Sequence, residues 1–403
     1  MNSIKVESEY LNSITKVGVI ADIQYCDEDD GTSFDGHEIR RYRESLNVTQ
    51  RAAESFKKFK VGAVLQLGDA IDGKSQNNFK RDFYERICPI LEIEVSKNGP
   101  ELGQNTSLNT IPRFDVIGNH ELYCATRAQL RPMLRHYNDE MDLYCYSKII
   151  ANGKWRMIIL DSYAVSLLGQ TTEPEDSQVS MQRKEAEDIV TKNNPNVLLN
   201  SKQTVNWFEG LPKEKHRYVP YNGAIGKQQL EWLKGELEEA WKEKQFVVLF
   251  SHIPLSGRTK HPKSLLWDME DVLELIKQNG SHVVACVGGH RHSFDYQMND
   301  EFDTQCHHID IPSPLIAPLE GEAHAILEFS VKNLPIAKEI SHIDDASTAS
   351  NRDENLVYHS GKVLATTQYV NCDTIKDVGI ITVNGFGTMP KLMHLGKIKP
   401  SEW

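Results

Sequence analysis

Five short apolar runs in this chain are each followed closely by a side chain that can bind a metal ion. The side chains are those of Asp22, Asp69, Asn119, His252 and His290, after runs such as VGVIA and FVVLFS. Short β-branched runs predict buried strands, and in open α/β sheets ligands gather beyond the carboxyl ends of the strands. The recurrence of metal-ligand types at five such ends predicts a two-metal hydrolase.

Helical patterns alternate with these strands and would hold their ends in place. Apolar residues recur at helical spacing within 39–59, 79–90, 230–241 and 265–276. Later strand patterns occur at 155–161, in HIDI, in AHAILEFSV and in VGIITVNGFG. The alternation predicts an α/β fold with two sheets packed face to face and helices outside.

Two polar stretches interrupt the alternation. Residues 169–222 are irregular apart from a short helical pattern near Ala186, Ile189 and Val190, and so long an excursion is expected to shape a substrate pocket. Residues 336–370 are polar and aperiodic, which predicts an exposed insertion before a final pair of strands.

The composition of the 403 residues is that of a soluble protein, with 39% hydrophobic and 25% charged residues. The formal net charge of −12 disfavours a nucleic-acid polymer as partner, because such binding relies on Lys and Arg. The N-terminal segment has no apolar signal region and no stretch is long enough to span a bilayer. We expect a cytoplasmic monomer that binds no membrane.

The seven cysteines are scattered and never form a C-x-x-C pair, so we expect reduced thiols and neither disulfides nor zinc ligands. The adjacent pair His307-His308 likewise lacks a spacing that identifies a further metal site, and we interpret it as structural.

The candidate ligands lie in compact motifs: DIQ at 22–24, GDAIDG at 68–73, GNHE at 118–121, SH at 251–252 and GHRH at 289–292. In this order they resemble the D-x-H, G-D-x-x-D, G-N-H-E, H and G-H-x-H pattern of the calcineurin-like metallophosphoesterases, over roughly residues 16–330. The resemblance implies a four-layer α/β/β/α sandwich, one domain over 12–396, and a dinuclear metal site at the carboxyl ends of the strands.

The resemblance also implies a division of the ligands between two metals. One metal is held by Asp22, Gln24, Asp69 and His292, and the other by Asp69, Asn119, His252 and His290. Asp69 then bridges, which suits a carboxylate because its two oxygens can bind cations about 3.5–4 Å apart. Two divalent cations and two aspartates leave a net positive site for a phosphate ester.

Gln24 departs from the commonest family pattern, in which His stands at this position. An amide oxygen is a harder ligand than imidazole, so we expect Mn²⁺, or Mg²⁺, in preference to Zn²⁺ or Fe. With Tyr25 and the segment RRYRESL at 40–46, the D-x-Q motif is similar to that of the manganese-dependent ADP-ribose/CDP-alcohol diphosphatases. This resemblance implies hydrolysis of ADP-ribose, CDP-choline and related nucleotide diphosphate esters to a nucleoside monophosphate and a phosphoester.

A two-metal site activates water, so the protein need not supply a nucleophile. His120 is the candidate general acid, and the resemblance implies that Asp72 orients its ring. For the substrate, we expect Phe34 to stack on a base and Arg41 and Arg43 to reach the phosphates.

Two other functions fit the same residues. One is a cyclic-nucleotide or general phosphodiesterase on the same scaffold, and the other is a metal-binding interaction module without catalysis. A panel of phosphoester substrates separates the first from a diphosphatase, and metal-dependent turnover of any of them excludes the second.

Overall fold

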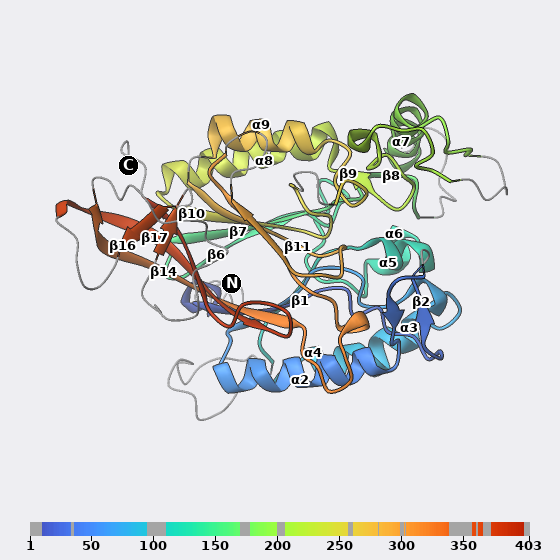
Figure 1. The fold of residues 1–403 in the computed structure, drawn as a ribbon, viewed down its shortest axis with the longest axis horizontal. Helices are drawn as coiled ribbons and strands as arrows, with labels where there is room; N and C mark the ends of the chain where they lie inside the picture. The colour runs from blue at the N-terminus through green and yellow to red at the C-terminus, as the bar shows by residue number, and fades with distance from the viewer. Residues whose placement is uncertain are drawn as a thin grey trace.

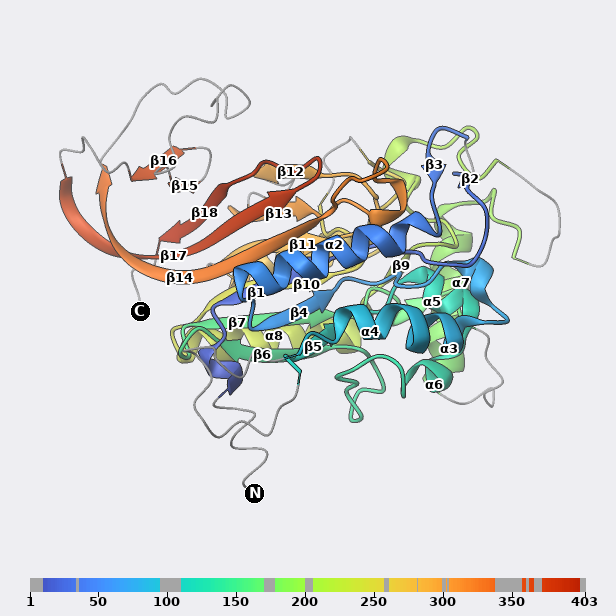
Figure 2. The ribbon, with the colours of Figure 1, turned by 90° about the horizontal axis from the view of Figure 1, so that it is seen from below.

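The structure is a computed structural model that describes residues 10–33, 36–94, 110–169, 178–199, 206–256, 261–280, 282–298, 302, 304–337, 357–359, 362–365 and 372–398. Two large sheets lie face to face between helices (Figures 1 and 2). The helices are α2 (Glu44–Phe59), α3 (Phe79–Arg81) and α4 (Cys88–Leu91) on one side, and α8 (Gly226–Lys242) and α9 (Met269–Asn279) on the other. The predicted α/β/β/α arrangement is confirmed. Within the described ranges no helix is both long and apolar enough to cross a membrane.

The first sheet has eight strands in the order β16-β15-β18-β17-β14-β1-β4-β5. In chain order they are β1 (Lys16–Ile20), β4 (Ala63–Gln66), β5 (Arg113–Asp115), β14 (His324–Ala337), β15 (Val357–His359), β16 (Lys362–Ala365), β17 (Cys372–Phe386) and β18 (Met393–Ile398). Strands β1, β4 and β5 run parallel, whereas β14 is antiparallel to β1. The carboxyl ends of the three parallel strands therefore meet at one edge.

The second sheet has six strands in the order β12-β13-β11-β10-β7-β6. They are β6 (Tyr146–Ile150), β7 (Trp155–Leu160), β10 (Phe246–Ser251), β11 (Val283–Gly288), β12 (Asp295–Met298) and β13 (His307–Asp310). The four central strands are parallel and the two edge strands antiparallel. Every residue of β10 and β11 is buried, which explains their continuous apolar sequences, because helices and the other sheet cover both faces.

The core between the sheets contains side chains from both inner faces, among them Val19, Leu65, Phe250 and Val287. Helix α2 packs on the outer face of the first sheet. Its Phe56 is fully buried against Gly18 of β1, where a Cβ atom would lie 2.6 Å from the phenyl ring.

The remaining elements are short, except for α7. They are β2 (Gly31–Thr32), β3 (Ile39–Arg40), α5 (Asn119–Cys124), α6 (Arg127–Leu130), β8 (Val165–Ser166), α7 (Gln178–Asn193), β9 (Gly223–Ala224), a π-helical turn at Asp82–Ile87, and 3-10 turns at Gly73–Ser75, Lys213–Lys215 and Pro314–Ile316. Helix α7 contains the helical pattern noted around Ala186, with Ala186 and Val190 fully buried.

The first helix was predicted too long. Ile39 and Arg40 form β3, which pairs with β2, and α2 begins only at Glu44. The physical reason is a long-range contact, since the backbone N–H of Arg41 donates to the carbonyl oxygen of Leu315 at 2.9 Å. Arg41 therefore precedes the helix instead of lying on it.

The segment expected as an insertion, 336–370, contains described strands. Strand β14 extends to Ala337, and β15 and β16 lie at the end of the first sheet (Figure 2). Residues 338–356, 360–361 and 366–371 lie outside the described part of the chain.

Candidate metal centre

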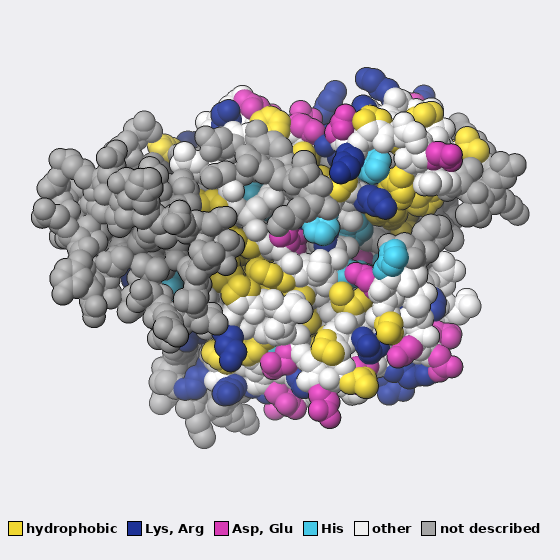
Figure 3. Space-filling model, in the orientation of Figure 1, with side chains coloured by type: hydrophobic (Ala, Val, Ile, Leu, Met, Phe, Trp, Pro, Cys, Tyr) yellow, Lys and Arg dark blue, Asp and Glu magenta, His cyan; other side chains and the backbone are white. Residues whose placement is uncertain are grey.

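The candidate ligands at the strand ends come from both sheets and meet in one place. Asp22, Asp69 and Asn119 follow β1, β4 and β5, while His252 and His290 follow β10 and β11. Figure 3 shows histidine and acidic side chains beside the hollow that crosses this face of the molecule. The fold thus delivers carboxylates and an amide from one sheet and imidazoles from the other.

Five of the candidate ligands have left-handed backbone conformations. The φ angles are 52° at Asp22, 45° at Gln24, 58° at Asp69, 66° at His290 and 62° at His292. Residues other than glycine rarely adopt such angles, and those that do cluster at functional sites where the surroundings hold them. In this site, hydrogen bonds between the loops provide that constraint.

The hydrogen bonds between these loops fix the strained backbone. The N–H of Gln24 donates to the carbonyl oxygen of Asp69 at 2.8 Å, and the N–H of His290 donates to Asp22 Oδ2 at 2.8 Å. The second bond joins the two sheets directly at the site.

One group of ligand atoms surrounds His252. Its Nε2 lies 3.4 Å from Asp69 Oδ2, 3.2 Å from Asn119 Oδ1 and 3.2 Å from His290 Nδ1. One ligand atom each from Asp69, His252 and His290 lie within 4.8 Å of one another. These spacings suit atoms that share a single cation.

A second group surrounds Asp22. Its Oδ1 lies 3.7 Å from His292 Nε2, while Gln24 Nε2 lies 2.9 Å from His292 Nε2 and 3.1 Å from Asp69 Oδ2. Asp69 Oδ2 belongs to both groups. The structure therefore brings together all seven side chains that the resemblance assigned as ligands.

Two buried oxygens of the second group are suited to binding a cation. Asp22 Oδ1 and Gln24 Oε1 are inaccessible to solvent and have no hydrogen-bond partner in the described structure. Leaving a buried acceptor unpaired costs about 1–3 kcal/mol, more for a charged group. A half-turn of the Gln24 amide group would place its oxygen where its nitrogen now lies, beside Asp69 and His292. The oxygen could then bind the same metal ion as these two side chains. The donor set fits a hard or borderline divalent cation.

The pKa shifts of the buried Asp22 and His252 are also consistent with a cation site. Burial raises the pKa of Asp22 even though His252 and His292 act against it. Burial lowers the pKa of His252, but Asp69 and Asp22 outweigh it and raise that pKa to about 9. Without metal, a proton on His252 offsets the carboxylate charge. A bound cation must replace this proton, since only the neutral imidazole binds metal.

Glu121 supports the backbone of the candidate site, although the sequence analysis gave it no role. Its fully buried carboxylate accepts from the backbone N–H groups of Asp69 at 2.9 Å, Ala70 at 2.7 Å and Gly118 at 2.9 Å. It therefore fixes the loop that carries the shared ligand. Its place in the GNHE motif was the available signal.

Two further side chains position ligands and were also missed. Tyr163 Oη donates to Asn119 Oδ1 at 3.0 Å, and Asn222 Oδ1 lies 2.9 Å from His290 Nε2. Outer partners of this kind fix the orientation of metal ligands. These contacts join distant segments of the chain and leave no local pattern in the sequence.

His120 and Asp72 meet as expected. His120 Nδ1 lies 3.1 Å from Asp72 Oδ2 and accepts from the N–H of Gly73 at 2.8 Å, while Nε2 lies 4.0 Å from Asp69 Oδ2. Burial lowers the pKa of His120, but Asp69 and Asp72 raise it overall. A protonated ring can donate from Nδ1 to the carboxylate of Asp72, whereas a neutral ring accepts at Nδ1 from the N–H of Gly73. In both, Nε2 keeps a proton on the side of the metal ligands.

The expected substrate-binding residues are placed differently. Phe34 lies outside the described residues. Arg41 donates to the carbonyl oxygens of Ile316 and Ala317, and Arg43 binds the carboxylates of Asp27 and Asp29 at the surface. The roles of these three residues stay predictions.

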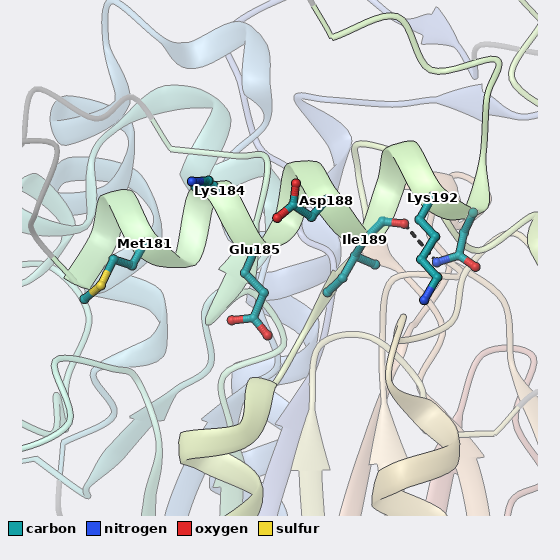
Figure 4. A pocket seen from close by; sticks show the side chains of 7 residues that line it. Met181, Lys184, Glu185, Asp188, Ile189 and Lys192 are labelled. Carbon is teal, nitrogen blue, oxygen red and sulfur yellow. Dashed lines mark hydrogen bonds between the residues drawn. The ribbon is translucent and has the colours of Figure 1, made fainter.

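A groove of about 500 Å³ lies elsewhere, along α7 (Figure 4). It is lined by side chains of that helix alone: Met181, Lys184, Glu185, Asp188, Ile189, Lys192 and Asn193. None of the candidate ligands lines it, so it is not the site of the expected chemistry.

Comparisons with known proteins found similar sequences and similar folds. Residues 15–294 match the family model of the calcineurin-like phosphoesterases. The manganese-dependent ADP-ribose/CDP-alcohol diphosphatase of Arabidopsis thaliana is 30% identical over 75% of this chain and 86% of its own, and that of Oryza sativa subsp. japonica is 31% identical over 77% and 87%. A dimetal phosphatase structure from Danio rerio has 22% identity and a TM-score of 0.65, covering 96% of this chain and 100% of the other.

Proposed function

The chain belongs to the calcineurin-like phosphoesterase family and is a metal-dependent hydrolase, and from this premise we propose that it cleaves the diphosphate of nucleotide diphosphate esters with two Mn²⁺ ions. The substrates are ADP-ribose, CDP-choline and related CDP-alcohols. The names of relatives that this chain matches over most of their length support this substrate class and this metal.

The observation that carries the proposal is the pair of ligand groups that share Asp69. Asp22, Gln24 and His292 complete one group and Asn119, His252 and His290 the other, with Gln24 making the first group rich in oxygen. Oxygen-rich sites with few nitrogen ligands favour Mn²⁺ over Zn²⁺. When bound, the two cations supply Lewis acidity toward phosphoryl oxygens and lower the pKa of water.

The residues of the chain supply the proton and the orientation. His120 donates from Nε2 to the leaving oxygen, and Asp72 stabilises the ring before it gives up the proton. Arg40 is the arginine whose charge acts on both His120 and Asp72, and its buried Nε has no hydrogen-bond partner in the described structure. We assign Arg40 to a phosphate oxygen of the substrate.

The test uses purified protein freed of metal with a chelator and then supplied with Mn²⁺. The expected products are AMP and ribose 5-phosphate from ADP-ribose, and CMP and phosphocholine from CDP-choline. Faster hydrolysis of cyclic nucleotides than of both diphosphates would replace the proposal with a phosphodiesterase. Bound Mn²⁺ without turnover of any phosphoester would leave the non-catalytic interaction module.

A further inference from the structure

A second cluster of metal-binding side chains lies outside the candidate metal centre. Cys286, Cys306 and His308 each offer a ligand atom, and the three atoms lie within 4.8 Å of one another. The two sulfurs are 3.6 Å apart. All three side chains are buried, with at most 5% of each residue exposed. The scattered spacing of the cysteines in the sequence gave no sign of this arrangement.

The register of two parallel strands creates the cluster. Cys286 on β11 lies opposite His308 on β13, and Cys306 lies just before β13, two residues from His308. Cys286 and Cys306 belong to one apolar core cluster, which also includes Leu273 of α9. The strands thus position Cys286 and His308, and Cys306 lies directly before the start of β13.

We propose that Cys286, Cys306 and His308 form a separate structural site for a thiophilic divalent cation, Zn²⁺. Two thiolates bound tetrahedrally to one zinc, with Zn–S of about 2.3 Å, lie roughly 3.8 Å apart. The observed 3.6 Å between sulfurs nearly equals that spacing, whereas a disulfide needs about 2.05 Å. The ion therefore fits with little movement of the backbone.

The charge balance favours the ion at this depth. Binding releases one proton from each thiol to solvent, and Zn²⁺ with two thiolates and a neutral imidazole has no net charge. A neutral complex avoids the cost of burying a net charge. The site is also distinct from the first one, because Cys286 lies within β11 whereas His290 follows the end of that strand, and the two groups of ligand atoms share no residue.

The cation would join β13, next to the edge strand β12, to the central strand β11. This role in holding the edge of the second sheet is independent of the proposed diphosphatase activity. Zn²⁺ bound here should therefore raise the thermal unfolding temperature of the protein even when the other site is filled with Mn²⁺.

The experiment is a Co²⁺ titration of the reduced full chain, pre-saturated with Mn²⁺ and followed by near-ultraviolet absorption. Thiolate-to-cobalt charge transfer reports only a sulfur-ligated ion, and the seven candidate ligands of the first site include no sulfur. We expect the band to saturate at one Co²⁺ per chain and to be bleached by Zn²⁺. The variants are Cys286→Ser and Cys306→Ser, and the matched control is Cys145→Ser, a buried cysteine outside the cluster.

We expect the band in the wild type and in C145S, and its loss in C286S and C306S. The proposal is overturned if the reduced wild type shows no charge-transfer band, or if the band persists in the double variant C286S/C306S. Because the wild-type titration alone can overturn it, a variant that fails to fold does not remove the test.

Discussion

Asp69 contacts both groups of candidate ligands, with Oδ2 near Gln24 and near His252. We predict that Asp69→Asn removes nearly all Mn²⁺-dependent turnover, since the substitution removes the shared charge from both metals. The loss should exceed the ~10–100-fold typical of an outer partner. Turnover and bound Mn²⁺ per chain are measured together, and near-normal turnover of D69N would refute a shared ligand.

Gln24→His is the matched comparison, because Gln24 contributes to one group only. The exchange of an amide for imidazole should leave substantial activity and shift metal preference from Mn²⁺ toward Zn²⁺. Rates with each metal, relative to the wild type, check this. Equal metal preference in the two proteins would remove Gln24 from the ligand set.

Tyr163 positions a ligand, and its hydroxyl can be removed with little change of volume. We predict that Tyr163→Phe weakens Mn²⁺ binding by about 10–100-fold through the loss of its bond to Asn119. Excess Mn²⁺ should then restore most of the rate. The control is Tyr144→Phe, a buried tyrosine whose hydroxyl has no partner in the described structure. If both variants bind Mn²⁺ alike, Tyr163 has no positioning role.

The role of His120 as general acid makes the effect of its removal depend on the leaving group. General acid catalysis contributes roughly 10²–10⁴-fold. We predict that His120→Ala slows hydrolysis of an alkyl phosphodiester most, ADP-ribose less and a nitrophenyl ester least, because basic leaving groups need a proton most. Rates on the three substrates are compared at equal metal content. An identical loss on all three would show that His120 positions the substrate instead.

At the scale of elements, the strands that end in ligands could be predicted because their signal is local. A run such as FVVLFS followed by His252 shows both the strand and its end. The start of α2 could not be predicted, since it depends on a bond from Arg41 to Leu315, far along the chain. Tyr163 was missed for the same reason.

The pairing of β14 with β17 predicts the outcome of a deletion. Ala337 lies opposite Cys372, so the two long strands are adjacent at both ends of residues 338–371, a range that includes the strands β15 and β16 at the end of the first sheet. We predict that a short Asn-Gly join in place of 338–371 preserves the Mn²⁺-dependent rate, because a two-residue turn can close an antiparallel pair. Thermal unfolding and turnover are measured. A folded but inactive deletion variant would assign these residues to the active site.

At the scale of the whole molecule, both sheets contribute to the metal centre, and the sequence indicated this through the residue types at five strand ends. It could not indicate how the sheets are joined there. The bond from the N–H of His290 to Asp22 links residues 268 apart in sequence. Metal binding is therefore expected to couple to the stability of the whole fold, since an intact site needs both sheets.

Stability at acid pH should depend on a histidine remote from the metal centre. His324 of β14 is fully buried, stacks on Phe386 at 4.0 Å between ring centroids, and meets Phe56 edge-on. Neither ring nitrogen has a hydrogen-bond partner in the described structure. Burial therefore lowers the pKa of His324 from 6.5 to about 3.

The direction of the effect follows from the lowered pKa of the folded state. Well above pH 6.5 the ring is neutral in both the folded and the unfolded chain, so its titration does not change the free energy of unfolding. As pH falls from 6.5 toward 3, only the unfolded chain takes up the proton, so the free energy of unfolding decreases by about 1.4 kcal/mol per pH unit. We predict that His324→Phe, which keeps the stacking, gains roughly 2 kcal/mol relative to the wild type between pH 7 and pH 5. Urea unfolding at the two pH values measures this, and a difference between the proteins that is the same at both would show that His324 takes up its proton equally in the folded chain.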